Sequence, residues 1–385
     1  MPVPPRSSGL STTALHGGAP HQPPGAPVVA PIFQSVNYLQ EFGTEEGLRY
    51  TRYANTPNIE TVQRRLALLE GAESALVLSS GMGATACAML ALLRPGDHLL
   101  TSSWIYGGTR RLFFDEFRTL GIEITEVDPL ESRSWRRGMR KETRAIFVES
   151  PVNPTCRVLD LHVAAQLAKE HGIALVVDST FASPINFRPL EHGADVVIQS
   201  TTKFLNGHHD ILGGAVMGTA SYVDEVRRKM ILWGQAPDPF ACWLLERGLK
   251  TLAVRVRQQN ANAQRLAEWC ATRPEFARVH YPGLPDHPDH ARAAELLDGF
   301  GGMMAVELAG GGPAADRFVK RLTVVKYAPS LGGVDSLVSA PRFSSNAHMS
   351  VEERAAIGIP EGFLRVSVGL EDVEDLVADF AHALA

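Results

Sequence analysis

The sequence predicts an α/β protein, in which a mostly parallel sheet is covered by helices on both faces and is followed by a smaller α+β domain. Two observations lead to this fold class. Between residues 61 and 199, apolar runs without polar alternation are separated by segments of helical spacing, which is typical of parallel strands buried on both faces. From residue 252 the pattern changes to one long amphipathic helix and isolated strand-like runs.

The elements of the first unit alternate along the chain. A helix is expected over 61–69, because apolar residues recur there at helical spacing and Gly71 follows as a stop. Further helices are predicted over 83–93, 109–120 and 161–170. Short runs rich in apolar residues predict strands at 74–78, 98–102, 145–148, 173–177 and 195–199, and alternation of apolar and polar residues predicts another at 122–127. The second unit is predicted to hold a helix over 252–271 and strands at 303–308 and 363–368.

The expected organisation is an extended arm over 1–55, a sheet domain over 56–250 and a C-terminal α+β domain over 251–385. The first 31 residues hold eight prolines, which lack a backbone donor and have a fixed φ, so no regular structure is expected there. The same stretch has no uninterrupted hydrophobic run, so no secretion signal is predicted. No apolar run in the sequence approaches the ~20 residues that a membrane-spanning helix needs.

Composition narrows the classes of function. The formal net charge of −5 lacks the basic footprint of a nucleic-acid-binding protein. The four cysteines are irregularly spaced, so neither a disulfide framework nor a cysteine-based zinc site is expected. Such cysteine usage suits the reducing cytoplasm, which is the expected location of the protein. The consecutive side chains of His208, His209 and Asp210 tend to diverge, so no metal ion is expected.

Two charged residues stand at the ends of predicted buried strands. Lys203 follows the strand at 195–199, beside Ser200 and Thr202, which are candidate phosphate ligands. Desolvation there would lower the pKa of its amine and allow it to attack a carbonyl. Asp178 follows the preceding strand, at the sheet edge where sites in open α/β sheets assemble, and a carboxylate there can hold a pyridinium nitrogen protonated. Taken singly, Lys203 is better explained as a surface lysine after an edge strand, and a capping or turn aspartate is common at a position such as that of Asp178.

A glycine-containing turn, Gly81-Met82-Gly83, lies between a predicted strand and an alanine-rich helix. Free N–H groups and the dipole of a helix start favour a phosphate at such a place. Gly81, Gly83 and Ala86 also match the dinucleotide fingerprint G-x-G-x-x-A, but the acidic residue that it requires at the end of the next strand is missing. A single phosphate is therefore favoured, and a nicotinamide-dependent dehydrogenase stays open as a competing function.

Four further residues fit a bound cofactor or substrate. Tyr106 precedes a predicted helix, where its ring could stack on a planar cofactor and its phenol could transfer a proton, although a buried turn tyrosine is the better explanation of this residue taken alone. Tyr50 and Arg52 could clamp a phosphate or lie in a solvated loop. Arg365 lies inside an apolar strand, so it needs a carboxylate partner from the protein or from a substrate.

In their joint order, these motifs resemble the Cys/Met-metabolism family of pyridoxal-phosphate (PLP) enzymes, which includes cystathionine γ-lyase, cystathionine γ-synthase, methionine γ-lyase and cystathionine β-lyase. The matching motifs are Tyr50-x-Arg52, Ser80-Gly81-Met82, Tyr106-Gly107-Gly108-Thr109, Glu149-Ser150-Pro151-x-Asn153-Pro154, Asp178, Ser200-x-Thr202-Lys203, His280-Tyr281-Pro282-Gly283-Leu284, Ser330-Leu331-Gly332-Gly333 and Arg365-x-Ser367-x-Gly369. The resemblance covers nearly the whole chain beyond the arm. It implies PLP fold type I, the aspartate-aminotransferase-like fold, with the cofactor bound by the sheet domain.

The resemblance also implies a role for each site residue. Lys203 would form the Schiff base with pyridoxal 5′-phosphate and shuttle the Cα and Cβ protons, Asp178 would contact the pyridine nitrogen, and Tyr106 would stack on the ring and protonate the leaving sulfur. The other implied contacts are Gly81, Met82, Ser200 and Thr202 to the phosphate, Asn153 near the 3′-oxygen, Ser330 and Arg365 to the substrate carboxylate, and Tyr50 and Arg52 to the phosphate of the neighbouring subunit. A site shared in this way implies a dimer, usually paired into a homotetramer, with the arm lying over the neighbouring subunit.

Several positions depart from the family pattern and leave the substrate open. Gly108 stands where methionine γ-lyases often carry Cys, and Pro329 stands where members that hold cystathionine by its distal amino group often carry Glu. Asn55-Thr56-Pro57, Ser179 and His209 also differ from the usual residues. We predict a carbon–sulfur lyase that acts on sulfur amino acids by γ-elimination, of the cystathionine γ-lyase or methionine γ-lyase type.

Two alternatives accompany this prediction. A γ-replacement transferase, of the cystathionine γ-synthase or O-acylhomoserine sulfhydrylase type, would use the same residues. It would differ from the lyase only in completing the reaction with a thiol instead of water. A non-catalytic scaffold with the same fold is disfavoured, because Lys203, Asp178 and Tyr106 are all present.

Overall fold

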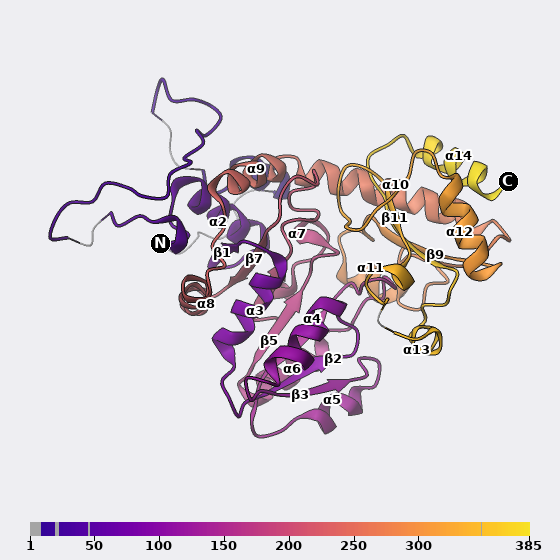
Figure 1. Cartoon of the computed structure of the whole chain (residues 1–385), viewed down its shortest axis with the longest axis horizontal. Helices are drawn as coiled ribbons and strands as arrows, with labels where there is room; N and C mark the ends of the chain where they lie inside the picture. Colours follow the sequence, from indigo (N-terminus) through magenta and orange to yellow (C-terminus); the bar gives the residue numbers. More distant parts are fainter. Residues whose placement is uncertain (1–8, 20–22, 45–46, 348) are drawn as a thin grey trace.

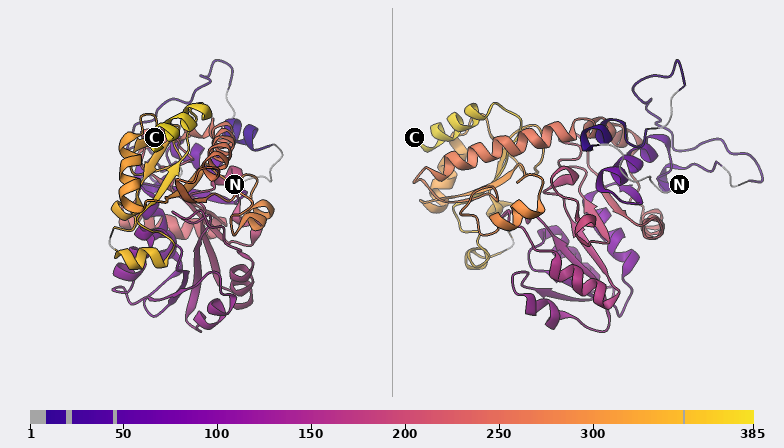
Figure 2. Two further views of the ribbon diagram at one scale, coloured as in Figure 1. Left: turned by 90° about the vertical axis from the view of Figure 1, so that its right-hand side faces the viewer. Right: turned by 180° about the vertical axis from the view of Figure 1, so that it is seen from behind.

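The computed structural model describes residues 9–19, 23–44, 47–347 and 349–385. It contains two β-sheets, and helix α10 (Leu252–Ala271) lies between them in the chain. In Figures 1 and 2 this long helix runs from the side of the first sheet to the helices around the second. A mostly parallel sheet followed by a smaller α+β unit is therefore confirmed, whereas the boundaries at 55/56 and 250/251 stay a prediction.

The first sheet has seven strands in the order β1-β7-β6-β5-β4-β2-β3. Their bounds are β1 Ser74–Leu78, β2 His98–Ser102, β3 Glu123–Val127, β4 Thr143–Glu149, β5 Ala174–Asp178, β6 Val196–Gln199 and β7 Gly214–Gly218. The pairs β2·β3, β2·β4, β4·β5 and β5·β6 are parallel, and β7 pairs antiparallel with both β6 and β1. Each predicted strand of this unit is present. The glycine-bounded strand β7 was not predicted.

The central strands are buried on both faces, as the lack of polar alternation predicted. In β4, Ala145 and Phe147 belong to one hydrophobic cluster, whereas Ile146 and Val148 belong to another. Neighbouring residues of a strand point to opposite faces, so both faces of the sheet carry a core. Helix α3 (Gly81–Leu92) packs against β6 and β7, and helix α6 (His162–His171) packs against β4 and β5. Each large side chain buried there contributes about 1.5–3 kcal/mol.

The helix predicted over 61–69 is α2 (Pro57–Glu70), which starts earlier because a proline suits the first helical position. It ends at Gly71, whose φ of 74° lies in the left-handed region. The helix predicted over 109–120 is α4 (Gly107–Arg111) followed by a π-helical turn at Leu112–Phe117. The remaining helices of this unit, which were not predicted, are α5 Ser132–Gly138, α7 Ser183–Asn186, α8 Ala220–Trp233 and α9 Pro239–Leu249.

The prediction that the N-terminal arm has no regular structure is wrong for one segment. Helix α1 (Leu10–His16) forms there because residues 6–19 contain no proline, so the backbone donors that proline removes are present. Ala14 is fully buried, and α1 packs on α2 and α10. Residues 23–44 form no helix, and they loop away from the body of the molecule in Figures 1 and 2.

The second sheet has five strands in the order β10-β11-β12-β9-β8. Their bounds are β8 Phe276–His280, β9 Met303–Leu308, β10 Lys326–Tyr327, β11 Leu337–Ser339 and β12 Phe363–Ser367, and the helices around them are α11 His290–Leu296, α12 Gly311–Arg321, α13 Val351–Ala356 and α14 Val373–Leu384. The two strands predicted in this unit, β9 and β12, are antiparallel neighbours. Within the described part of the chain, no helix has the length and apolar character needed to cross a membrane.

Candidate active site

A cavity of about 400 Å³ lies at the edge of the first sheet where β4, β5 and β6 end, and loops of the second unit close it. Parallel strands place their carboxyl ends at one edge, so the residues that follow them gather there. All predicted site residues except Tyr50 and Arg52 line this cavity: they are Gly81, Met82, Tyr106, Asn153, Asp178, Ser200, Thr202, Lys203, Ser330 and Arg365.

Lys203 lies in the turn after β6 and reaches toward the second unit. Its Nζ donates a hydrogen bond of 2.8 Å to Oγ of Ser330. Burial, and to a lesser degree the positive charge of Arg365, lowers the pKa of Lys203 to about 8. A substantial fraction of the amine is therefore neutral near that pH, and the neutral amine is the form that attacks a carbonyl.

Ser330, which accepts this hydrogen bond, is held in an unusual backbone conformation. Its φ is 87°, in the left-handed region that favours glycine. Its carbonyl oxygen accepts a hydrogen bond of 2.7 Å from Nη2 of Arg365, and two residues later Gly332 donates its N–H to Oγ of Ser367, at 2.8 Å. Contacts with β12 therefore hold the loop that carries Ser330 beside Lys203.

Asp178 is the last residue of β5 and presents a carboxylate to the cavity. Its Oδ1 accepts hydrogen bonds from the N–H and the hydroxyl of Thr180, at 3.0 and 2.6 Å. Its Oδ2 accepts no hydrogen bond from the described residues, and no lysine or arginine there forms an ion pair with it. Burial raises the pKa of Asp178 above its ordinary value. A cationic donor in the cavity would therefore gain a partner here.

Arg365 is an interior residue of β12 and is 8% exposed. Its Nη1 donates to Oδ1 of Asn153 at 3.1 Å, and its Nη2 donates to the carbonyl of Ser330. The buried Nε has no partner among the described residues, and no protein carboxylate forms an ion pair with the guanidinium. Of the two partners considered for this arginine, the structure thus favours a carboxylate that comes from a ligand.

The start of helix α3 forms an anion cradle on one side of the cavity. Oγ of Ser80 caps the helix by accepting the N–H of Gly83 at 2.9 Å, so the N–H groups of Gly81 and Met82 point beyond the helix end. A Cβ atom on Gly81 would lie 3.0 Å from Oγ of Ser200, which leaves little room for any larger residue. The hydroxyl of Thr202 lines the same side but already exchanges hydrogen bonds with Gly213.

Tyr106 stands at the mouth of the cavity, where its side chain is 41% exposed. Its backbone N–H donates to Oε2 of Glu149 at 2.6 Å. A Cβ atom on Gly108 would lie 2.5 Å from the Tyr106 ring and 3.2 Å from Sδ of Met82. The ring therefore lies over Gly108, in a position that a larger residue at 108 would displace.

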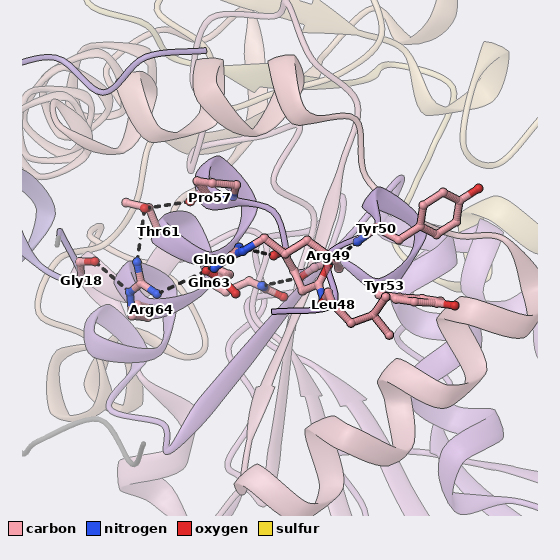
Figure 3. A network of polar contacts seen from close by, with 12 residues as sticks. Gly18, Leu48, Arg49, Tyr50, Tyr53, Pro57, Glu60, Thr61, Gln63 and Arg64 are labelled. Carbon is pink, nitrogen blue, oxygen red and sulfur yellow. Dashed lines mark hydrogen bonds and ion pairs between the residues drawn. The ribbon is translucent and has the colours of Figure 1, made fainter. Parts of the chain in front are cut away.

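Tyr50 and Arg52 do not reach this cavity within one chain. They line a separate hollow together with Gly234 and Pro237, and Arg52 donates to the carbonyl of Ile231 at 3.2 Å. Figure 3 shows the network that holds this segment: Asn55 accepts the N–H of Tyr50 at 3.0 Å, Arg49 forms an ion pair with Glu60 at 3.1 Å, and the rings of Tyr50 and Tyr53 point away from these contacts. The two predicted phosphate ligands thus lie at a separate hollow, outside the cavity of their own chain.

The structure also places residues that sequence reasoning left aside. Glu149, the last residue of β4, lines the cavity beside Asp178; it ends a predicted strand in the same way as Asp178, and this signal could have identified it. The loop residues Ser344 and Ser345 line the cavity too, but nothing in their sequence pattern indicated this position. Among the described residues, no cluster of three or more His, Cys, Asp or Glu side chains is arranged to bind a metal ion.

Comparisons with known proteins agree with the resemblance. The model of a family described as Cys/Met metabolism PLP-dependent enzyme matches residues 11–385. The L-methionine gamma-lyase of Pseudomonas putida is 39% identical over 98% of this chain and 97% of the relative, and the cystathionine gamma-synthase of Mycobacterium leprae is 38% identical over 98% and 97%. The solved structure of cystathionine gamma synthase from Xanthomonas oryzae pv. oryzae superposes with a TM-score of 0.94, at 37% identity and 98% coverage of each chain.

Proposed function

Because the chain belongs to the Cys/Met-metabolism family of PLP-dependent enzymes, we propose that it is a carbon–sulfur lyase that cleaves a sulfur amino acid by γ-elimination. The observation that carries this proposal is the pair formed by Lys203 and Arg365. A desolvated amine and a buried guanidinium without a protein carboxylate face the same cavity. That pair suits a substrate with an α-carboxylate and an acidic Cα–H. The family assignment removes the dehydrogenase from the competing functions.

The cavity residues fit pyridoxal phosphate. Asp178 is a half-buried carboxylate without a cationic partner in the described chain, and such a partner is what a protonated pyridine nitrogen would supply. The open N–H groups at the start of α3 and the absence of a Cβ at Gly81 suit a phosphate. When bound, the cofactor supplies an electron sink that stabilises negative charge at the substrate's Cα.

In the proposed mechanism, Arg365 and Asn153 hold the substrate carboxylate and thereby fix the direction of the Cα–H bond. The neutral amine of Lys203 removes the Cα proton and then relays a Cβ proton. Ser330 keeps that amine oriented through the 2.8 Å hydrogen bond. The phenol of Tyr106, at the cavity mouth, donates a proton to the departing sulfur.

The rest of the lining supports a thioether substrate. Besides Lys203 and Arg365, the charged side chains in the described lining are Glu149 and Asp178, which lie at the sheet edge, while Leu212, Pro329 and Leu331 are apolar. Within one chain, the far end of a substrate therefore meets no charge. The uncharged thioether of methionine matches such a wall, whereas the distal amino and carboxylate groups of cystathionine would need partners beyond this lining. An activated homoserine ester is the alternative that a transferase would use.

The experiment that tests the proposal uses the enzyme loaded with pyridoxal phosphate and L-cystathionine as the sole amino acid, with identification of the keto acid by mass spectrometry. Formation of 2-oxobutanoate with release of cysteine is the expected result for γ-elimination. If 2-oxobutanoate forms from L-methionine and not from L-cystathionine, the enzyme is of the methionine γ-lyase type. If neither is cleaved but a homoserine ester and a thiol condense, the lyase proposal is wrong and the transferase replaces it.

The lowered pKa of Lys203 leads to a pH prediction. Only the neutral amine reacts with the cofactor aldehyde, so the rate at which cofactor-free enzyme takes up pyridoxal phosphate should rise about tenfold per pH unit and level off above about pH 8. The same reaction with free lysine, measured in parallel by visible absorbance, accounts for the cofactor's own titrations. Levelling only near the ordinary lysine pKa of 10.5 would contradict the desolvation of this amine.

The same shift affects stability, with a defined sign. Between pH 8 and 10.5 the folded chain binds fewer protons at Lys203 than the unfolded chain does. The contribution of this residue to the free energy of unfolding of the cofactor-free enzyme therefore grows as the pH rises through that window.

We further propose that the active unit is a dimer in which Tyr50 and Arg52 complete the site of the neighbouring subunit, with dimers paired into a tetramer. Two features support this. Both residues line a hollow separate from the cavity of their own chain. The adjoining arm exposes Val28, Leu39 and Phe42 almost completely, at 100%, 102% and 103%, and burial of such side chains needs a covering surface.

Subunit mixing tests this shared site. Lys203→Ala and Arg52→Ala should each be nearly inactive alone, because each removes one part of every site. After the two variants are unfolded together and refolded, mixed dimers contain one intact site, so about a quarter of the wild-type activity should return. Mixing without subunit exchange is the control. Absence of recovery, with mixed dimers demonstrated by mass, would show that each site is built from one chain.

A further inference from the structure

Glu149 is a buried carboxylate with two unusual hydrogen-bond partners. It is 5% exposed and lies at the carboxyl end of β4, paired in register with Asp178 of β5. Its Oε2 accepts the backbone N–H of Tyr106 at 2.6 Å, and its Oε1 accepts the backbone N–H of Asn153 at 3.0 Å. One side chain thus holds two loop segments that are 47 residues apart in the sequence.

Both residues that Glu149 holds, Tyr106 and Asn153, line the cavity. The Tyr106 ring lies at the cavity mouth over Gly108, and Oδ1 of Asn153 accepts the hydrogen bond from Arg365. A shift of either backbone would move the ring that flanks the cofactor or the amide that orients the guanidinium. Displacements of this size are enough to impair catalysis, because the reacting groups must stay aligned.

We infer that Glu149 is a positioning residue that ties Tyr106 and Asn153 to the carboxyl edge of the sheet and so sets the distance between the cofactor ring and the carboxylate-binding Arg365. Its effect on cofactor binding follows from the geometry alone, and its effect on turnover rests on the proposed function. Glu149 has no lysine or arginine partner among the described residues, so its charge is not used for a salt bridge.

The pattern of acceptors explains why a carboxylate is needed. The N–H groups of Tyr106 and Asn153 approach the two different oxygens of one side chain, so both of these atoms must be acceptors. A carboxylate has two acceptor oxygens, whereas the amide of Gln, which has the same shape, has one. Burial, and then the charge of Asp178, raises the pKa of Glu149, which means that these two effects disfavour its ionised form. The hydrogen bonds from Tyr106 and Asn153 act in the opposite direction and favour the charged form.

The test compares Glu149→Gln with a matched control, Asp379→Asn. Gln has the same shape but turns an NH₂ group toward one of the two N–H donors. Asp379 is also a buried carboxylate, 4% exposed, that accepts the backbone N–H groups of Thr323 and Val325, at 2.7 and 2.9 Å, but it does not line the cavity. Both substitutions should lower the thermal stability, whereas only one should disturb the site.

For Glu149→Gln we expect the loaded enzyme to lose pyridoxal phosphate about tenfold faster on dialysis, which is the effect of one unsatisfied buried donor. The circular dichroism induced in the cofactor band should change as well, and kcat/KM should fall at least as much. Asp379→Asn should match the wild type in all three. If Glu149→Gln only lowers stability, as the control does, and keeps wild-type cofactor retention and circular dichroism, the inference is wrong.

This outcome is distinguishable from a failure of the proposed function. Cofactor retention and induced circular dichroism are measured without substrate, so they test Glu149 even if the enzyme proves to be a transferase. Conversely, wild-type lyase activity can be established or refuted without any Glu149 variant.

Discussion

Replacement of Lys203 by alanine should lower turnover by a factor of about 10³ or more while the protein stays folded. The side chain supplies the only amine in the described cavity lining, and its Nζ lies 2.8 Å from Oγ of Ser330. In the proposed mechanism, its loss would leave the cofactor without a covalent attachment and the Cα proton without a base. Steady-state assays, the visible absorbance of the lysine-bound cofactor and thermal unfolding together measure this effect.

A matched control is Lys169→Ala, which removes an exposed lysine on α6, far from the cavity lining. It should keep both activity and the visible band. Retention of activity in the Lys203 variant, with its melting temperature unchanged, would mean that another group serves as base and that the mechanism proposed above is wrong.

The second large effect is expected for Arg365→Lys. A guanidinium can bind a carboxylate through two hydrogen bonds, whereas an ammonium cannot reproduce this geometry together with the contacts to Asn153 and Ser330. Loss of about 2–3 kcal/mol of charge-assisted hydrogen bonding predicts a decrease in kcat/KM of about 100-fold, seen largely as a higher KM. The visible cofactor band should be unaffected.

Arg354→Lys serves as the control for a buried arginine. Arg354 is 7% exposed, but it forms an ion pair with a protein carboxylate, that of Glu361. This variant should lose stability and keep the wild-type KM. If Arg365→Lys likewise lost only stability, then Arg365 would have a structural role, and the substrate carboxylate would be bound elsewhere.

Much of the site could be predicted because of one topological rule. The carboxyl ends of parallel strands share an edge, so Asp178 at the end of β5 and Lys203 after β6 had to lie near each other once both strands were recognised. The apolar runs identified these strands, because strands buried on both faces are nearly continuous in apolar residues up to their ends. Glu149 obeys the same rule at the end of β4, and its acceptor role became visible only with the loop geometry.

Other parts depend on contacts that no local pattern encodes. Arg365 is brought to the cavity from a different sheet, and only the packing of the second unit shows that its Nε lacks a protein partner. Strand β7, with glycine at both ends, carries too weak a strand signal to be predicted. Helix α1 lies between proline-rich stretches, and seven residues are too few for a stable isolated helix, so its packing on α2 and α10, with Ala14 fully buried, stabilises it.

Substrate choice is encoded least directly of all. Gly108 leaves room for the ring of Tyr106, and Pro329 adds no charge to the part of the lining that it forms. Both effects are differences of shape and charge at the cavity mouth, where the neighbouring subunit is proposed to add Tyr50 and Arg52. Relatives with lyase and with synthase activity lie at similar identity, 39% and 38%, so identity alone does not separate these activities.

The central claim is that the chemistry takes place at Lys203, within the cavity closed by Ser330 and Arg365. Its most direct test is reduction of the loaded enzyme with borohydride, followed by proteolysis and mass spectrometry of the peptides. We expect the mass of the reduced cofactor on the peptide that contains Lys203, and on no other lysine. A modified lysine elsewhere, or an unmodified Lys203 in an enzyme that retains its cofactor and activity, would contradict the claim.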